Sequence, residues 1–126
     1  MDVEERLKLE KALLHPVRLA IVLTLITRGD ATIAELEKVL GIARQTIYTH
    51  LRKLMKASLV VKTIELSDRP RPRYRFNWRM AFTILGVLES IRDRVGLAIE
   101  TLQQVLSEEQ GDNEELRSDE KDVKEW

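Results

Sequence analysis

The sequence predicts a mainly α protein with one small β-hairpin and a long C-terminal helix. Through most of its 126 residues, apolar side chains recur at intervals of three and four, the spacing of amphipathic helices. The segment near 59–78 differs, because its alternating residues and two prolines are typical of two strands and a turn. After it, a single helical spacing continues from Ala81 to Val105.

Composition excludes several classes of protein. No apolar run approaches the ~18 residues of a membrane span, and the charged N-terminus lacks the apolar stretch of a signal peptide, so a cytoplasmic protein is expected. The chain has no cysteine, which excludes disulfides and thiolate metal sites. No metal site or cofactor is expected. Without a phosphate-cradling loop or a nucleophile–base pair, the chain is not expected to be an enzyme.

Two helices are expected at the N-terminus, Asp2–Leu14 and a second from Pro16 to about Thr27. His15 separates them, because a proline disfavours the helical conformation in the residue before it and suits the first turn of a helix. A helix-start role is therefore expected for His15. The second helix is apolar nearly all round, which predicts the central buried element.

A short capped helix and a tight turn follow. Thr32 and Glu35 have the spacing of a capping box, and Gly41 should end this helix in the left-handed conformation. Another helix is expected within Gly41–Leu59. Ala43 near its start counts against the motif, because Ser, Thr, Asp or Asn at this position would cap the helix and stabilise it by ~1 kcal/mol. Two helices joined by such a turn are nevertheless typical of a helix-turn-helix.

The helix within Gly41–Leu59 has two opposed faces. Ile47, Leu51 and Leu54 form the apolar face, and His50 beside them is expected to be packed or hydrogen-bonded rather than a ligand. The opposite face mixes cations with an amide, a hydroxyl and a phenol, which suits base edges and phosphates in a DNA major groove. Its members are Arg44, Gln45, Tyr48, Thr49 and Arg52. The alternative is an ordinary solvated surface.

Leu59–Leu66 and Arg73–Trp78 are expected to be strands joined by a turn at Ser67–Pro72. In the second strand, aromatic residues alternate with arginines, so the aromatic face should pack on the helices. Arg69 and Arg71 lie in the expected turn and should reach furthest, toward phosphates or the minor groove. The remaining arginines share the outer face. Of these, Arg73 is a further DNA-binding candidate, and Arg75 is the one most expected to be structural. The alternative for all four is edge-strand protection by charge.

The formal net charge of zero hides a strong asymmetry. Residues 1–80 contain 16 Lys and Arg against 9 Asp and Glu, whereas residues 81–126 contain 5 against 12. Within 42–79 the counts are 10 and 2. Such segregation indicates that the middle of the chain meets a polyanion.

The long helix is expected from about Met80 to Leu106, and it has an apolar seam over more than three heptads. The predicted dimer interface consists of Ile84, Leu88, Ile91, Val95, Ala98, Leu102 and Val105. A helix of this length, ~40 Å, exceeds what one small domain covers, which favours a homodimer over packing on the chain's own core. Three regions result: residues 1–79 with the DNA-binding domain, 80–109 with the dimerisation helix, and an acidic tail at 110–126 that is expected to be disordered.

The chain resembles the winged helix-turn-helix transcriptional regulators of the ArsR-like superfamily, in an archaeal-type form. The similarity begins with HPVRLAIV at 15–22, is strongest at TIYTHLRKL at 46–54, and continues through Ala57-Ser58-Leu59-Val60. It covers about residues 12–78. Ile42 and Ser58 depart from the family, which more often has leucine and glycine there.

The resemblance implies a dimeric DNA-binding regulator whose second motif helix enters the major groove. By matching positions it adds Thr46, and more weakly Lys53, to the DNA-facing residues. The metal-sensing members use cysteine-rich or histidine-rich sites, so metal sensing is not carried over. The expected function is a homodimeric repressor of a pseudo-palindromic operator, with no effector indicated. Two alternatives stay open: a winged-helix module that binds a protein partner, and a nonspecific architectural DNA-binding protein.

Overall fold

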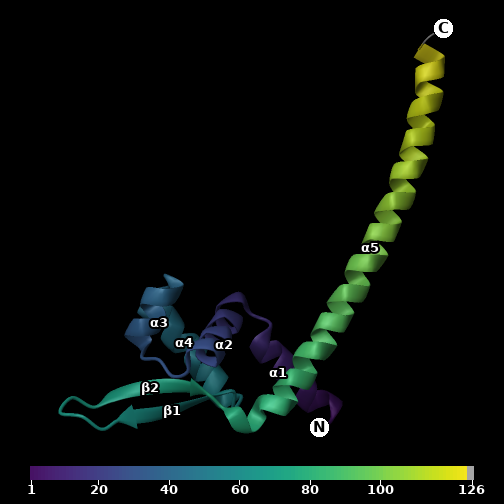
Figure 1. The fold of residues 1–126 in the computed structure, drawn as a ribbon. Coiled ribbons are helices and arrows are strands. Elements are labelled where there is room, and N and C mark those ends of the chain that lie inside the picture. The colour runs from purple at the N-terminus through teal and green to yellow at the C-terminus, as the bar shows by residue number, and fades with distance from the viewer. Residues whose placement is uncertain (125–126) are drawn as a thin grey trace. The chain divides into compact units, whose positions relative to one another are not determined.

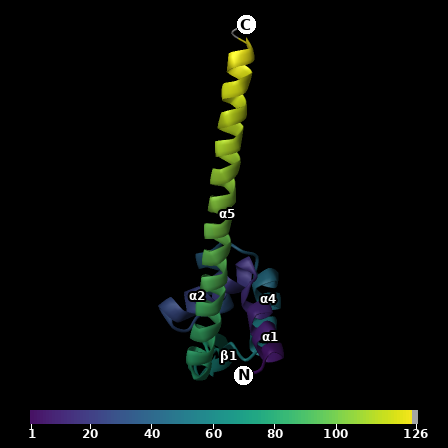
Figure 2. The same cartoon turned by 90° about the vertical axis from the view of Figure 1, so that its right-hand side faces the viewer.

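The computed structural model describes the backbone of residues 1–124 and the side chains of residues 1–112. The chain divides into two compact units, residues 1–88 and the part from residue 89 onward. Figures 1 and 2 show the elements of both units from two directions. Along the described residues, no helix is both long and apolar enough to cross a membrane.

The first unit begins with helices α1 (Val3–Leu13) and α2 (Pro16–Arg28), and each has a side-chain cap. Asp2 Oδ1 accepts a hydrogen bond from the Glu5 amide at 2.8 Å. His15 Nδ1 accepts one from the Val17 amide at 3.2 Å. These bonds satisfy amides that have no partner within a helix. The expected helix-start role of His15 is thereby confirmed.

Helix α2 is the central element that the sequence predicts, since it contacts α1, α3, α4 and β2, but it is buried on one side only. Ile21 and Leu25 on one side have no exposed surface, but Leu19 and Leu23 on the other are 42% and 60% exposed. The helix is therefore covered on one side within this unit, although its sequence is apolar on both.

Helices α3 (Ile33–Leu40) and α4 (Arg44–Lys56) form the helix-turn-helix. Thr32 Oγ1 accepts a hydrogen bond from the Glu35 amide at 3.2 Å, which confirms the cap of α3. Gly41 ends α3 with φ 66° and ψ 28°, a left-handed conformation that costs glycine little because it has no Cβ. Ala43 is the N-cap of α4 and makes no side-chain capping bond.

Strands β1 (Val60–Glu65) and β2 (Arg71–Phe76) form an antiparallel hairpin, in which Val60 pairs with Phe76 and Glu65 with Arg71. Arg71 therefore lies in the strand and not in the turn, because pairing extends further toward the tip than expected. Trp78 lies outside the strand, in the short 3₁₀ helix η1 (Trp78–Met80), and is 60% exposed. The expectation that it packs in the core is wrong, since the chain turns at Asn77.

The core of the first unit lies where the hairpin meets the helices (Figure 1). Tyr74 and Phe76 face inward from β2, as expected, and are almost fully buried. Ala31, before α3, exchanges two backbone hydrogen bonds with Tyr74, at 2.9 and 2.8 Å. The hairpin is thus bonded to the chain just before the helix-turn-helix. The buried apolar residues of this core include Leu13, Ile21, Leu25, Leu36, Ile47, Leu51, Leu54, Leu59 and Val60.

Helix α5 runs from Ala81 to Lys124, a length of 44 residues. Its first turns belong to the first unit, where Ile84 and Val87 are buried. Ile84 is therefore a core residue, which corrects its assignment to the dimer interface. The tail at 110–126 was expected to be disordered, but α5 continues through it to Lys124. Its Glu, Lys and Arg residues have good helix propensity. Residues 125–126 lie outside the described part.

Candidate nucleic-acid interface

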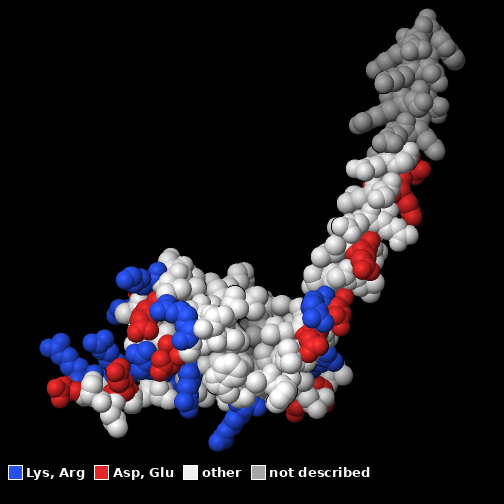
Figure 3. All heavy atoms as spheres, in the orientation of Figure 1, with Lys and Arg blue, Asp and Glu red and all other residues white. Residues whose placement is uncertain are grey.

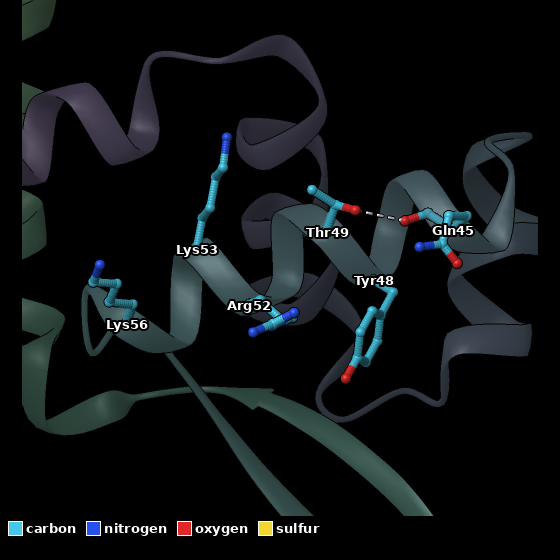
Figure 4. A pocket seen from close by; sticks show the side chains of 6 residues that line it. All are labelled: Gln45, Tyr48, Thr49, Arg52, Lys53 and Lys56. Atoms are coloured by element: carbon cyan, nitrogen blue, oxygen red, sulfur yellow. Dashed lines mark hydrogen bonds between the residues drawn. The ribbon is translucent and has the colours of Figure 1, made fainter.

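Helix α4 separates apolar and polar side chains as the sequence predicts. Ile47, Leu51 and Leu54 are fully buried on its inner face. A hollow of about 400 Å³ lies along the outer face (Figure 4). Its lining consists of Gln45, Tyr48, Thr49, Arg52, Lys53 and Lys56. Four of the predicted DNA-facing residues, together with Lys53, are thus side by side; Arg44 and Thr46 are also exposed but do not line this hollow.

Lys56 was not anticipated from the sequence. The signal was available, because positions 45, 49, 52 and 56 follow helical spacings of four, three and four. Lys56 therefore extends the cationic part of the same helix face by one turn beyond Arg52. Both side chains are exposed, which leaves their charges accessible to a large polyanion.

Several side chains of this face are held by local contacts. The Arg52 guanidinium carbon lies 5.9 Å from the centre of the Tyr48 ring, within the range of a cation–π interaction. The Thr49 hydroxyl donates to the Gln45 carbonyl at 2.9 Å (Figure 4). Arg44 forms an exposed ion pair with Glu37 of α3, with Nε and Oε2 3.3 Å apart. Such a pair is weak in water, so a phosphate group can replace the carboxylate.

The N-terminus of α4 offers a further feature for anions. Because Ala43 has no side-chain acceptor, its side chain leaves the first amides of the helix uncapped. These amides point out of the helix at the positive end of its dipole, where a phosphate group is favoured. The alanine that weakens the helix start thus also leaves the amides accessible.

The hairpin carries the second group of predicted DNA contacts. Arg69 and Arg71 are exposed near its tip, and Figure 3 shows cations gathered over this end of the hairpin. Ser67 stabilises the turn, since its hydroxyl donates to the Arg69 carbonyl at 2.9 Å and accepts from the Arg69 amide at 3.3 Å. The two guanidinium groups are therefore carried on a defined turn and strand.

Arg73 lies among three carboxylates instead of facing solvent. Its guanidinium is 3.0 Å from Asp30, 3.6 Å from Glu35 and 3.5 Å from Glu65. The hydrogen bond with Asp30 raises the pKa of Arg73 and lowers the pKa of Asp30. Only 23% of the Arg73 side chain is exposed. These contacts join β2 to α3 and β1, so the structure gives Arg73 a structural role in place of the predicted DNA contact.

Arg75, which was expected to be the structural arginine, is exposed. Its exposure does not support the purely structural role expected for it, whereas Arg73 has such a role. The sequence alternation is the same for both residues. They differ because Arg73 is within ion-pair distance of Asp30, Glu35 and Glu65, whereas Arg75 affects Asp30 only through its charge.

His50 lies on the inner side of α4 and is hydrogen-bonded, as expected. Its Nδ1 is 3.3 Å from Arg18 Nη1, and its ring centre is 4.3 Å from that of His15. Burial, and then the charges of His15, Arg18 and Lys53, lower the pKa of His50. A neutral His50 therefore connects α4 to the start of α2.

The family model described as a helix-turn-helix domain matches residues 13–63. The transcriptional repressor BigR from Xylella fastidiosa is 31% identical, with a TM-score of 0.56, and the match covers 70% of this chain and 86% of that one. A transcriptional regulator homologue from Pyrococcus horikoshii OT3 is 28% identical, also with a TM-score of 0.56, over 74% of this chain and 98% of that one.

An ArsR family transcriptional regulator shares the fold, with 20% identity and a TM-score of 0.54 over 74% of this chain and 92% of that one. The comparison with curated proteins finds no match.

Proposed function

The chain belongs to the ArsR-like winged helix-turn-helix transcriptional regulators, and from this premise we propose that it is a homodimeric repressor that binds a pseudo-palindromic operator. One observation carries the proposal: the outer face of α4 combines cations, an amide and hydroxyl groups along a single hollow. Side chains of these types form hydrogen bonds with base edges in the major groove and with phosphates.

The contacts would divide by chemistry. Gln45 has an amide that can bond an adenine edge in two places, whereas Arg44 and Arg52 suit guanine or phosphate. Arg69 and Arg71 on the hairpin would bind phosphates or enter the minor groove. The uncapped N-terminus of α4 would accept one more phosphate.

The homodimer is proposed from the second unit. Beyond Ile84, the seam continues with residues that are partly or mostly exposed, of which Val95 is 52%, Leu102 58% and Val105 45% exposed. Ile99 and Leu106, 52% and 48% exposed, lie close to the same side of the helix. An exposed apolar stripe of this length favours association, and a second copy presents the same stripe. The proposed interface is Leu88, Ile91, Val95, Ala98, Leu102 and Val105.

Footprinting of genomic fragments with purified protein tests the proposal. A dimer that places two copies of α4 in successive major grooves should protect two half-sites about 34–36 Å apart. Gln45→Ala should relax the base preference at one position of each half-site. Arg71→Ala should weaken binding to all sequences and lower the salt slope by about 1 per protomer. Lys11→Ala, on α1, is the matched control and should change neither property.

The outcomes separate the alternatives. Equal affinity for all sequences, with steep salt dependence, would indicate an architectural DNA-binding protein. No binding to any fragment would indicate a protein-interaction module. Unchanged base preference in Gln45→Ala would contradict the placement of α4 in the major groove.

A further inference from the structure

A second hollow of the first unit, called here the α1 hollow, lies beside the end of α4. It has a volume of about 520 Å³. Its walls come from α1 and the chain before it, from the end of α4 and the two residues that follow, and from the chain between η1 and the first turn of α5. Every lining residue belongs to the first unit. A hollow of this size is within the range of sites for small organic molecules.

The lining of the α1 hollow combines apolar side chains with charges. Leu9 of α1 and Met80 of η1 contribute apolar surface. Among the described residues, the lining has two ammonium groups, from Lys8 and Lys56, and one carboxylate, from Glu5. No ion pair engages either lysine within the described part of the chain. An excess of positive charge beside apolar surface suits an organic anion with an apolar body.

Ser58, which also lines the α1 hollow, has a backbone conformation that serine rarely adopts. Its φ is 62°, and among the described residues it is the one residue other than glycine with a positive φ. This left-handed conformation is unfavourable for residues with a Cβ. A serine here therefore costs stability, and what it adds is a hydroxyl group that can donate a hydrogen bond to an anion. Backbone strain of this kind is typical of functional positions.

Hydrogen bonds hold the wall to which Ser58 belongs. Its amide donates to the Met55 carbonyl at 3.0 Å, and its carbonyl accepts from Asn77 Nδ2 at 2.8 Å. The Asn77 amide donates to the Leu59 carbonyl at 2.9 Å. The end of α4 is thus bonded to the segment that leads into η1 and α5. A site between segments held in this way is largely preformed, so a ligand binds it with a smaller loss of conformational entropy.

Lys56 lines both the α1 hollow and the DNA-facing hollow along α4. In Figure 4 it lies at the end of the row of labelled side chains, far from Gln45. Its side chain is exposed, and a lysine stem is flexible, so its ammonium group can turn toward an anion in either hollow but not in both at once. An anion held by Lys8 and Ser58 would therefore draw this charge away from DNA.

An ordinary solvated surface explains only part of this arrangement. It accounts for the exposed lysines, which are common on helices. It does not account for a serine where glycine would be free of strain, or for apolar side chains gathered from separate segments. Both features are explained if the α1 hollow binds a ligand with an apolar part and an anionic part.

We propose that the α1 hollow is an effector site for organic monoanions with an apolar body, such as carboxylates, and that an anion bound there weakens DNA binding through Lys56. The regulatory half of this inference rests on the proposed function, whereas the site itself is tested without DNA. Because binding free energies are linked, DNA should weaken anion binding by the same factor.

The site is tested with 2-naphthoate as the probe and the neutral alcohol 2-naphthalenemethanol as its control. Titration of the full chain, followed by NMR of its amide groups, should shift the signals of Lys56, Ser58 and Thr83, with a Kd of about 1 mM or lower. The alcohol should bind roughly 5-fold more weakly, because it lacks the charge.

Two variants test the contacts with the probe. Ser58→Gly should fold at least as stably as the wild type, because glycine adopts a positive φ without strain, yet it should bind the probe about 2- to 10-fold more weakly. Lys8→Gln should weaken probe binding about 2- to 5-fold. Lys11→Gln, on the same helix but outside the lining, is the matched control and should bind the probe as the wild type does.

The regulatory half is tested on the operator duplex identified by footprinting. Saturating probe, compared with sodium acetate at the same concentration, should lower the DNA affinity of the wild type and reduce its salt slope by about 1 per protomer. Lys56→Gln should already have the lower slope and should not respond further to the probe.

The site is overturned if the probe shifts none of these amides, if the alcohol binds equally well, or if Ser58→Gly and Lys8→Gln both bind the probe as the wild type does. A probe effect on DNA binding that persists in Lys56→Gln would overturn the role of Lys56. Failure of the wild-type protein to bind DNA would instead overturn the proposed function, and with it the regulatory half, whereas the NMR titration would still decide the site.

Discussion

The arginines of the hairpin differ in what surrounds them, although they alternate regularly in the sequence. Arg71 is exposed near the tip, and Arg75 is exposed nearer the base. Arg73 between them is surrounded by Asp30, Glu35 and Glu65. An arginine among carboxylates already has its donors occupied, so of the three it is the least available to phosphates.

We expect Arg73→Ala to loosen the hairpin from the helix-turn-helix without unfolding the domain. The two backbone hydrogen bonds between Ala31 and Tyr74 lie beside this ion-pair cluster. Their amides should exchange with solvent faster in the variant, while Arg75→Ala should leave them unchanged. Hydrogen exchange measured by NMR tests this, and equal protection in both variants would contradict a positioning role for Arg73.

His50 should make stability depend on pH. Because its pKa is lowered in the folded state, the unfolded chain binds more protons near and below the ordinary histidine pKa of about 6.5. The contribution of His50 is therefore present above that pH and is lost as pH falls toward the lowered pKa. The melting temperature of the wild type should fall more between about pH 7 and pH 5 than that of His50→Gln. The glutamine can still accept a hydrogen bond from Arg18, but it does not titrate. Identical pH profiles would refute this assignment.

Among the helices, α4 combines a weak start with an accessible N-terminus. A serine in place of Ala43 could cap the free amides, because Ala43 already has an extended ψ of 140°. Ala43→Ser should raise the free energy of unfolding by about 1 kcal/mol and reduce DNA affinity, since the capped amide no longer binds phosphate. Denaturant unfolding and DNA titration measure the two effects. Ala57→Ser, at the C-cap, should produce neither, and tighter DNA binding by Ala43→Ser would exclude the phosphate role.

Helix α5 changes its environment along its length. Ile84 is 2% exposed, whereas Leu102 on the same side of the helix is 58% exposed. Ile84→Ala should therefore lower the stability of the first unit by about 2–5 kcal/mol, since it removes buried methyl groups and leaves a cavity. Denaturant unfolding measures the loss. A variant as stable as the wild type would show that Ile84 is not a core residue.

For the molecule as a whole, the exposed seam predicts dimerisation. Leu102→Lys places a charge in the proposed interface and should shift the protein toward monomers. Leu97→Lys is the control. Leu97 is also exposed, to 65%, but it lies five positions before Leu102 and therefore about 140° around the helix from it. Analytical ultracentrifugation distinguishes the two variants. If both or neither dissociate, the interface does not lie along the proposed seam.

Charge is also distributed over the whole molecule. All but one of the cations of residues 42–79 lie on α4 and the hairpin, and Arg79 lies in η1. The candidate DNA-binding residues of α4 and of the hairpin tip belong to this segment. The acidic residues are concentrated from residue 81 onward. The charge segregation therefore favours polyanion binding by the first unit.

The sequence by itself determined the features that depend on near neighbours. The caps at Thr32 and His15, the left-handed Gly41 and the two faces of α4 all follow from bonds or spacings within a few residues. Local patterns of this kind act through helix periodicity and terminal amides, which the surrounding fold changes little.

Only the tertiary structure decided the features that depend on distant segments. The role of Arg73 arises from Asp30, more than forty positions away, and the burial of Ile84 arises from packing in the first unit. A periodic sequence states which side of a helix or strand is apolar or charged, but what covers that side is set by which elements meet in three dimensions.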